Sequence, residues 1–259
     1  MSVTPASRSG LLPPDQRWLP HLAVALAVIA GACDGMAVVG LKGVFVSNQT
    51  GNMVLLGLGF VRSGATATAD HTISLVAFVI GVAVAGLLIE YLLRRGIRHP
   101  LPALLLIQGI LIATAAVIIT LSGNELAGSA AVMASLFALA SAMGMQSVCL
   151  HRVGKWSLQT VAFNPMLVSG TLDLVAQAIR SPISTAVPDR RPPKIVIWFA
   201  VVVASFIVGA ILAALMYDAG GPQMLFIVAG ATLLSAFITT RIALPDSGRP
   251  PQGCEPDQP

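Results

Sequence analysis

The chain has 259 residues, of which 56% are hydrophobic and only 10% are charged. A soluble domain carries about 25% charged residues, so this composition excludes an ordinary water-soluble protein and predicts an all-α membrane protein. The net charge of +4 would suggest nucleic acid as a partner of a soluble protein. In a membrane protein it is typical of basic cytoplasmic loops, so we expect a lipid bilayer and no nucleic acid as partners.

Six apolar segments are long enough to cross the hydrocarbon core, which about 20 helical residues span. They cover residues 20–41, 72–93, 101–121, 127–149, 195–217 and 222–241. Residues 1–19 and 242–259 are rich in Pro, Gly and polar residues, which predicts two disordered cytoplasmic tails. Residues 20–241 are then a single transmembrane domain.

Two shorter apolar stretches, residues 45–62 and 160–180, do not fit a full span. Runs this short are typical of re-entrant or interfacial helices, whose free backbone groups are buried in protein or line a cavity. If both stretches crossed the membrane, the chain would have eight spans with its termini still on one side.

The basic residues predict the orientation of the six spans. On this map, all but Lys42 and Arg62 of the 15 Lys and Arg residues fall on one side of the membrane. Because basic loops stay in the cytoplasm, both termini are predicted to be cytoplasmic. An odd number of spans would destroy this segregation.

The two halves of the domain, about 20–121 and 127–241, resemble each other weakly in four places. The matched stretches are 31–36 with 140–145 (Gly35 against Gly144), 50–53 with 169–172, 78–81 with 206–209, and 102–114 with 222–235 (Gly109 against Gly230). Three spans is an odd number, so the second half would be inverted relative to the first. Inverted repeats with interrupted short helices are typical of secondary transporters, although a duplication kept only for packing is the alternative.

Polar residues at the interrupted positions are the candidates for a solute site. Thr50 is predicted to cap the short helix that follows it, and Gly51 and Asn52 add a close approach and an amide. Ser169-Gly170-Thr171 repeats the pattern in the second half. The free N–H groups of such helix starts suit an anion or a carbonyl oxygen, but both motifs could equally be simple capped starts.

Asp34 is the acid that lies well inside a predicted span, where an ionised carboxylate costs roughly 2.5–3.5 kcal/mol. It could couple protons or coordinate a cation, or it could be a neutral partner of a neighbouring helix or a partner of Lys42. Its neighbours Gly31 and Gly35 predict a close-packing helix face. The intramembrane amides Gln108 and Gln146 could bind solute or join two helices, and Glu90 is expected to pair with Arg94.

The sequence offers little for an enzyme. The four His residues fall at membrane edges without metal-ligand spacing, and no Ser–His–Asp order or phosphate-binding loop is present. Cys33, Cys149 and Cys254 are neither spaced as metal ligands nor arranged as a disulfide framework. We therefore expect no catalytic residue, metal or cofactor, with a membrane-embedded enzyme as the remote alternative.

Residues 45–52, Phe-Val-Ser-Asn-Gln-Thr-Gly-Asn, resemble the YoaK-like family of multi-pass membrane proteins, a family of unknown function. Its later motifs have counterparts here in residues 144–147 with His151 and Arg152, and in residues 169–172, although Ser147 and Ser169 depart from the family pattern. The resemblance covers roughly residues 20–240. It implies a six-span integral membrane protein and no particular substrate.

These observations predict a six-span transporter or permeation protein for a small solute, with its site between inverted repeats. A structural or assembly membrane protein is the second possibility. The solute, the coupling ion and the oligomeric state stay open. The candidate solute-binding residues are Asp34, Asn48, Thr50, Gly51, Asn52, Gln146, Ser169, Gly170 and Thr171.

Overall fold

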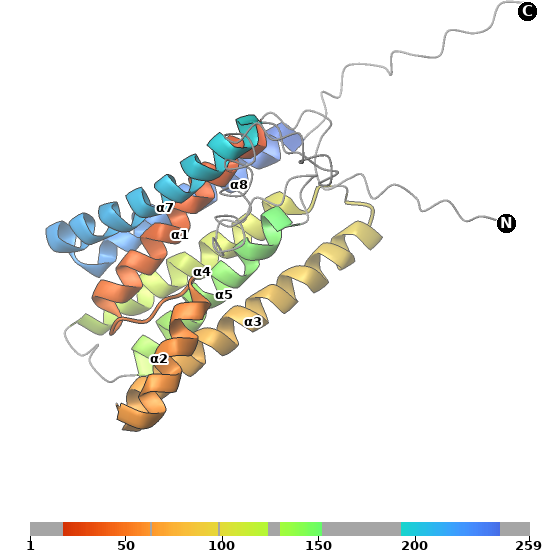
Figure 1. The fold of residues 1–259 in the computed structure, drawn as a ribbon. Coiled ribbons are helices and arrows are strands. Elements are labelled where there is room, and N and C mark those ends of the chain that lie inside the picture. The colour runs from red at the N-terminus through yellow and green to blue at the C-terminus, as the bar shows by residue number, and fades with distance from the viewer. Residues whose placement is uncertain (1–17, 63, 98, 124–129, 152–192, 244–259) are drawn as a thin grey trace, which may run out of the picture.

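The structure is a computed structural model, and it describes residues 18–62, 64–97, 99–123, 130–151 and 193–243 (Figure 1). Most of these residues are helical and none is in a strand, which confirms the all-α prediction for them. The helices are α1 (Leu19–Gly40), α2 (Gln49–Arg62), α3 (Gly64–Arg94), α4 (Leu101–Ser122), α5 (Ala130–His151), α7 (Pro193–Gly220) and α8 (Leu225–Ala243), with the 3-10 turn η4 (Pro222–Met224) before α8.

Six of these helices (α1, α3, α4, α5, α7 and α8) are long and apolar enough to cross a membrane. This number confirms the six predicted spans within the described residues. The intervening helix α2 has 14 residues and is too short to cross, so the first half does not contain the extra span of the eight-span alternative. The predicted tails and the stretch 160–180 lie mostly or wholly outside the described residues.

The helices form one bundle that α4 helps to connect. Figure 1 shows α1 beside α7 at one side and α3 at the other, with α2 lying against α3. Helix α1 packs along α7, α3 packs along α5, and α4 contacts both α5 and α8. The most apolar 18 residues of α1 and of α5 are the most enclosed, with 67% and 72% buried, so the first helix of each sequence half lies at the centre.

Four glycines allow the backbones of paired helices to touch. A Cβ on Gly31 of α1 would overlap the carbonyl oxygen of Phe206 in α7, and a Cβ on Gly209 of α7 would overlap that of Val28 in α1. Small residues at such positions let membrane helices approach closely. Gly35 meets Ala210 and Ala213 of α7, so the predicted close-packing face of Gly31 and Gly35 is confirmed.

The α3–α5 pair repeats this arrangement. A Cβ on Gly81 of α3 would overlap the carbonyl oxygen of Ser141 in α5, and a Cβ on Gly144 of α5 would overlap that of Phe78 in α3. The contacts of Gly144 therefore correspond to those of Gly31. In the sequence comparison Gly144 stands against Gly35, one helical turn from Gly31.

The chain reverses direction at the end of α1. Lys42 and Gly43 both adopt positive φ, at 62° and 78°, and the Gly43 N–H donates to the carbonyl oxygen of Val38 over 3.1 Å. This is the Schellman arrangement that ends many helices, with Lys42 at the position where glycine is usual. The following residues then run back along α1, so that α2 begins beside Asp34.

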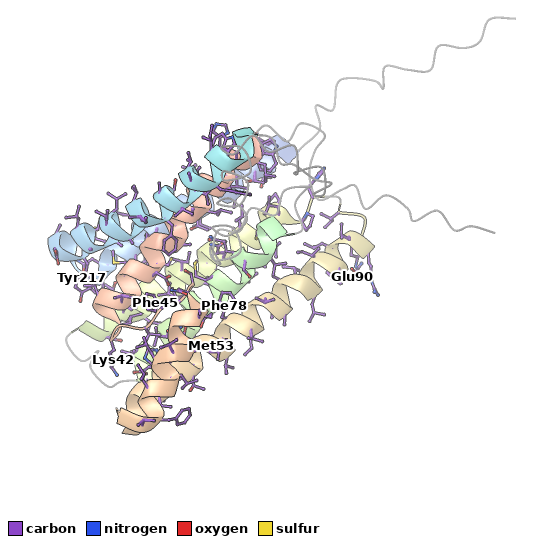
Figure 2. All side chains as sticks on the ribbon, viewed as in Figure 1. Lys42, Phe45, Met53, Phe78, Glu90 and Tyr217 are labelled. Carbon is purple, nitrogen blue, oxygen red and sulfur yellow. The ribbon has the colours of Figure 1, made fainter. Side chains whose placement is uncertain are left out.

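Lys42 and Glu90 mark the two ends of the bundle. Figure 2 shows Lys42, Phe45 and Tyr217 toward one end and Glu90 toward the other. We call these the Lys42 end and the Glu90 end. Asp34 precedes the last residue of α1 by six positions, which places the start of α2 about 9 Å inside the Lys42 end.

Candidate functional site

The carboxylate of Asp34 holds the returning segment. Its Oδ1 accepts hydrogen bonds from the backbone N–H groups of Val46 and Ser47, each at 2.7 Å, and its Oδ2 accepts one from the Ser47 hydroxyl at 2.5 Å. Asp34 and Ser47 are both buried. The side chain thus satisfies backbone donors that would otherwise be unpaired within the bundle, each at a cost of about 1–3 kcal/mol.

Asn52 fixes the other side of the same segment. Its Oδ1 accepts from the Phe45 N–H at 3.1 Å, and its Nδ2 donates to the Phe45 carbonyl oxygen at 2.6 Å, to Gln49 Oε1 and to Ser74 Oγ. The Ser74 hydroxyl of α3 also donates to the Phe45 carbonyl oxygen, at 2.7 Å. One amide therefore closes the loop of residues 45–52 and ties it to α3.

His71 completes this contact from α3, with Nδ1 3.2 Å from Asn52 Oδ1. Because the Nδ2 of Asn52 faces three oxygens, its Oδ1 is the atom that faces the imidazole. An amide oxygen only accepts, so the ring carries its proton on Nδ1. We call Asp34, Ser47, Asn52, His71 and Ser74 the polar cluster.

Asn48, and not Thr50, caps α2. The helix begins at Gln49, and the Asn48 Oδ1 accepts from the Gly51 N–H at 3.4 Å. The prediction of Thr50 as the cap was wrong, because the polar run of residues 47–50 offers several capping side chains and the direction of the returning segment selects among them. Gly51 is confirmed as a close approach, since a Cβ there would lie 3.0 Å from the Phe45 ring.

Lys42 pairs with Asp70 and not with Asp34. Lys42 Nζ lies 3.3 Å from Asp70 Oδ2 at the start of the α3 span, and Asp70 is buried. The proposed ion pair of Asp34 with Lys42 was therefore wrong, because the reversal at Gly43 turns Lys42 toward α3. Glu90 and Arg94 form the expected exposed pair at the opposite end, at 3.1 Å.

Gln108 and Gln146 form a second polar site, which we call the amide pair. Gln108 Nε2 of α4 donates to Gln146 Oε1 of α5 at 2.5 Å, and Gln146 Nε2 donates to the Leu26 carbonyl oxygen of α1 at 2.8 Å. Both glutamines are completely buried. Their predicted role in joining helices is confirmed, and the contact connects three spans.

The candidate residues therefore lie at two levels of the bundle. Asp34, Asn48, Gly51 and Asn52 come together around the start of α2, with Thr50 exposed beside them. Gln146 contacts α1 at Leu26, eight residues before Asp34, so the two levels are about 12 Å apart along α1. Ser169, Gly170 and Thr171 lie outside the described residues.

Several members of the polar cluster were not among the sequence candidates. Ser47, Ser74 and His71 take part through contacts that join α1, α2 and α3. Ser47 lies in the family-like motif and could have been included. Nothing local to Ser74 or His71 signals their roles, because their partners are set by how α2 packs on α3. Among the described residues, no group of three or more His, Cys, Asp or Glu residues could hold a metal.

Six helices long and apolar enough to cross a membrane, with buried polar contacts between them, define a multi-pass α-helical membrane protein. A family described as "Protein of unknown function (DUF1275)" matches residues 22–238. The chain belongs to this family. Neither the curated proteins nor the solved structures gave a match.

Proposed function

We propose that the protein transports a small solute or lets it permeate, along a path between two inverted three-span repeats. The observation that carries this proposal is the start of α2, which lies about 9 Å inside the bundle with the polar residues Asn48 and Thr50 exposed. A polar, non-helical segment at membrane depth is tolerated where it is enclosed by protein or meets water. Interrupted helices at such positions form the solute sites of many secondary transporters.

The reciprocal glycine contacts support the inverted repeat. Gly31 and Gly209 meet across α1 and α7 as Gly144 and Gly81 meet across α5 and α3. The first span of each half thus packs on the second span of the other half in the same manner. The proposed repeat pairs α1 with α5, α3 with α7 and α4 with α8, and Ser169-Gly170-Thr171 is its proposed second helix start.

The amide pair supplies a second polar point on the proposed path. Gln146 reaches from α5 to the Leu26 carbonyl oxygen of α1, at the contact of the two central helices. Buried polar groups within a membrane bundle are costly and often mark a pathway. We propose that solute passes between the polar cluster and the amide pair, along α1 and α5.

Both termini are proposed to lie in the cytoplasm, on the strength of the distribution of Lys and Arg. The proposed partners are the lipid bilayer and a small solute, with no nucleic acid, and we propose no enzymatic activity. We also propose, from the resemblance of residues 45–52, that the protein is related to YoaK-like membrane proteins.

A structural or assembly role is the second candidate, and one observation favours it. The side-chain polar atoms of Asp34 and Asn52 form hydrogen bonds with other residues of the chain. Such residues can stabilise a loop without touching a solute. Asp34 is then a positioning residue, and coupling through Asp34 is not part of the transport proposal.

The test is solute flux in vesicles that contain the purified protein. Stopped-flow light scattering would follow vesicle volume after osmotic challenge with glycerol, urea, sugars and amino acids in turn. The expected result is faster entry of at least one solute than in protein-free vesicles. Thr50→Val should slow this entry, whereas Thr114→Val should not, because the exposed Thr114 hydroxyl donates to Ile110 within α4. No acceleration for any of these solutes would favour the structural role.

A further inference from the structure

Two buried polar atoms inside the bundle have no hydrogen-bond partner among the described residues. They are Gln108 Oε1 of α4 and Ser135 Oγ of α5, and both residues are completely buried. The other such atoms in the described part of the chain belong to Trp18, Asp70 and His99, which lie near the ends of the bundle. Because a buried polar atom without a partner destabilises a fold, Gln108 and Ser135 call for an explanation within the membrane.

The free oxygen of Gln108 follows from the direction of the hydrogen bonds in the amide pair. The Leu26 carbonyl oxygen only accepts, so Gln146 presents its Nε2 to Leu26 and its Oε1 to Gln108. Gln108 must then donate with Nε2, which turns its own Oε1 away from Gln146. The amide pair therefore ends in an acceptor oxygen that no described residue fills.

The hydroxyl of Ser135 lacks the bond that a helical hydroxyl can form with its own backbone. Thr232 and Thr239 of α8 each donate to the carbonyl oxygen four residues before them. Such a bond satisfies a hydroxyl inside an apolar helix. Ser135 forms no bond of this kind within the described residues, so its hydroxyl is free both to donate and to accept.

Ser135 and the amide pair lie on one face of α5. Ser135 precedes Gln146 by eleven residues, which is about three helical turns and about 16 Å. Gln146 faces α4 and α1, so Ser135 lies on the same side of α5, about 8 Å inside the Lys42 end. Leu139 and Ala142 lie between them on this face and are buried and apolar. Two polar points separated by an apolar stretch therefore follow the contact of α5 with α1 and α4.

This part of the bundle carries no charge. Residues 26–33 of α1, 108–122 of α4 and 130–146 of α5 contain no Asp, Glu, Lys, Arg or His. An ion or a zwitterion on this route would lose its water without meeting an opposite charge, which is costly in a membrane. An uncharged molecule needs only hydrogen-bond partners, and the two free atoms supply them.

We propose that Gln108 Oε1 and Ser135 Oγ are binding points for a small uncharged molecule that carries O–H or N–H groups. The molecule donates to Gln108 Oε1 toward the Glu90 end, and it exchanges a hydrogen bond with Ser135 toward the Lys42 end. It is either water or an organic solute such as urea or glycerol. The inference rests on the proposed function and names the class of molecule that the path admits.

The test is stopped-flow light scattering of vesicles that contain the full-length protein, with water, urea, glycerol and glycine as probes. We expect faster entry of water, urea or glycerol than in protein-free vesicles. Glycine, a zwitterion at neutral pH, should enter no faster than without the protein. Ser135→Ala removes one hydrogen bond to the passing molecule and should slow its entry roughly two- to tenfold. Gln108→Met should slow the same molecule, because it removes the acceptor oxygen.

Ser141→Ala is the matched control for Ser135→Ala. Ser141 is a buried serine of the same helix, and its hydroxyl donates to the Ala77 carbonyl oxygen of α3 over 3.1 Å. Its substitution should lower the melting temperature in detergent and leave entry unchanged. Ser135→Ala should leave the melting temperature unchanged or raise it, because it removes an unpaired buried hydroxyl. A packing role for Ser135 predicts a lower melting temperature and unchanged entry.

The outcomes separate this site from the proposed function. Unchanged entry in Ser135→Ala, or glycine entry as fast as that of urea and glycerol, would overturn the site and leave transport standing. Faster entry of water alone, slowed in Ser135→Ala, would assign the two atoms to water and remove the transport of an organic solute. If none of the four probes entered faster than in protein-free vesicles, both proposals would fail.

Discussion

At the scale of single residues, the buried carboxylate of Asp34 is explained by the backbone that it serves. A chain that turns back into a membrane bundle leaves N–H groups without partners, and hydrocarbon cannot supply them. Asp34 accepts two such N–H groups and the Ser47 hydroxyl. The acid is therefore part of what allows the segment of residues 45–47 to return along α1.

Asp34→Ala should destabilise the protein by about 2–5 kcal/mol, because it leaves the N–H groups of Val46 and Ser47 buried and unpaired. Asp34→Asn should cost less, since it keeps an acceptor oxygen. Thermal unfolding in detergent measures both. Glu90→Ala is the control, because its pair with Arg94 is exposed and worth a few tenths of a kcal/mol. If Asp34→Ala unfolded at the same temperature as Glu90→Ala and the wild type, the carboxylate would not stabilise the returning segment.

Residue identity predicted some of these contacts and missed others. Gln108 and Gln146 were recognisable as interhelical partners, because a buried amide in a membrane needs one. The partner of Asp34 was not, because it depends on the positive φ of Lys42 and Gly43, which nothing in the apolar pattern specifies. The same reversal of the chain places the Lys42 side chain beside Asp70, with which it forms an ion pair.

At the scale of helices, apolar length fixes the spans well. The stretches 20–41 and 101–121 became Leu19–Gly40 and Leu101–Ser122. The span of α3 begins at Thr68, four residues before the predicted start at 72, and the helix itself begins at Gly64. Residues 64–71 are mostly Ala, Thr and polar residues, which form a helix but carry no hydrophobic signal.

Substitution at the glycine contacts should separate backbone contact from helix propensity. Gly81→Ala should cost about 1–3 kcal/mol, since its Cβ would overlap the Ser141 carbonyl oxygen. Gly86→Ala, in the same helix with nothing within 4 Å, should be neutral or gain up to about 1 kcal/mol. Thermal unfolding of the two variants side by side makes the comparison. Equal effects would mean that the α3–α5 backbones do not touch.

At the scale of the whole molecule, the proposed orientation places the Glu90 end in the cytoplasm and the Lys42 end outside. Leu121→Cys at the Lys42 end and Ile97→Cys at the Glu90 end are both exposed positions. With Cys254 replaced by Ser, a membrane-impermeant maleimide should label Leu121→Cys in intact cells and Ile97→Cys only after permeabilisation. The reverse labelling pattern would place the Lys42 end in the cytoplasm. It would contradict the orientation predicted from the Lys and Arg residues.

The sequence was also informative about the bundle as a whole, within limits. Weak similarity between the halves pointed to related spans. It could not reveal that α1 packs on α7 and α5 on α3, because the partner of an apolar face is not encoded in its own periodicity. The glycine contacts supplied that information.

The most direct test of the central claim is whether water reaches the start of α2. Thr50→Cys and Thr114→Cys place thiols at two exposed positions within the bundle's length, one beside the polar cluster and one on α4. In intact vesicles, a small membrane-impermeant thiol reagent should modify Thr50→Cys rapidly and Thr114→Cys slowly, because only the first would line a water-filled path. If Thr50→Cys reacted as slowly as Thr114→Cys, the start of α2 would be sealed from water and the permeation path would be contradicted.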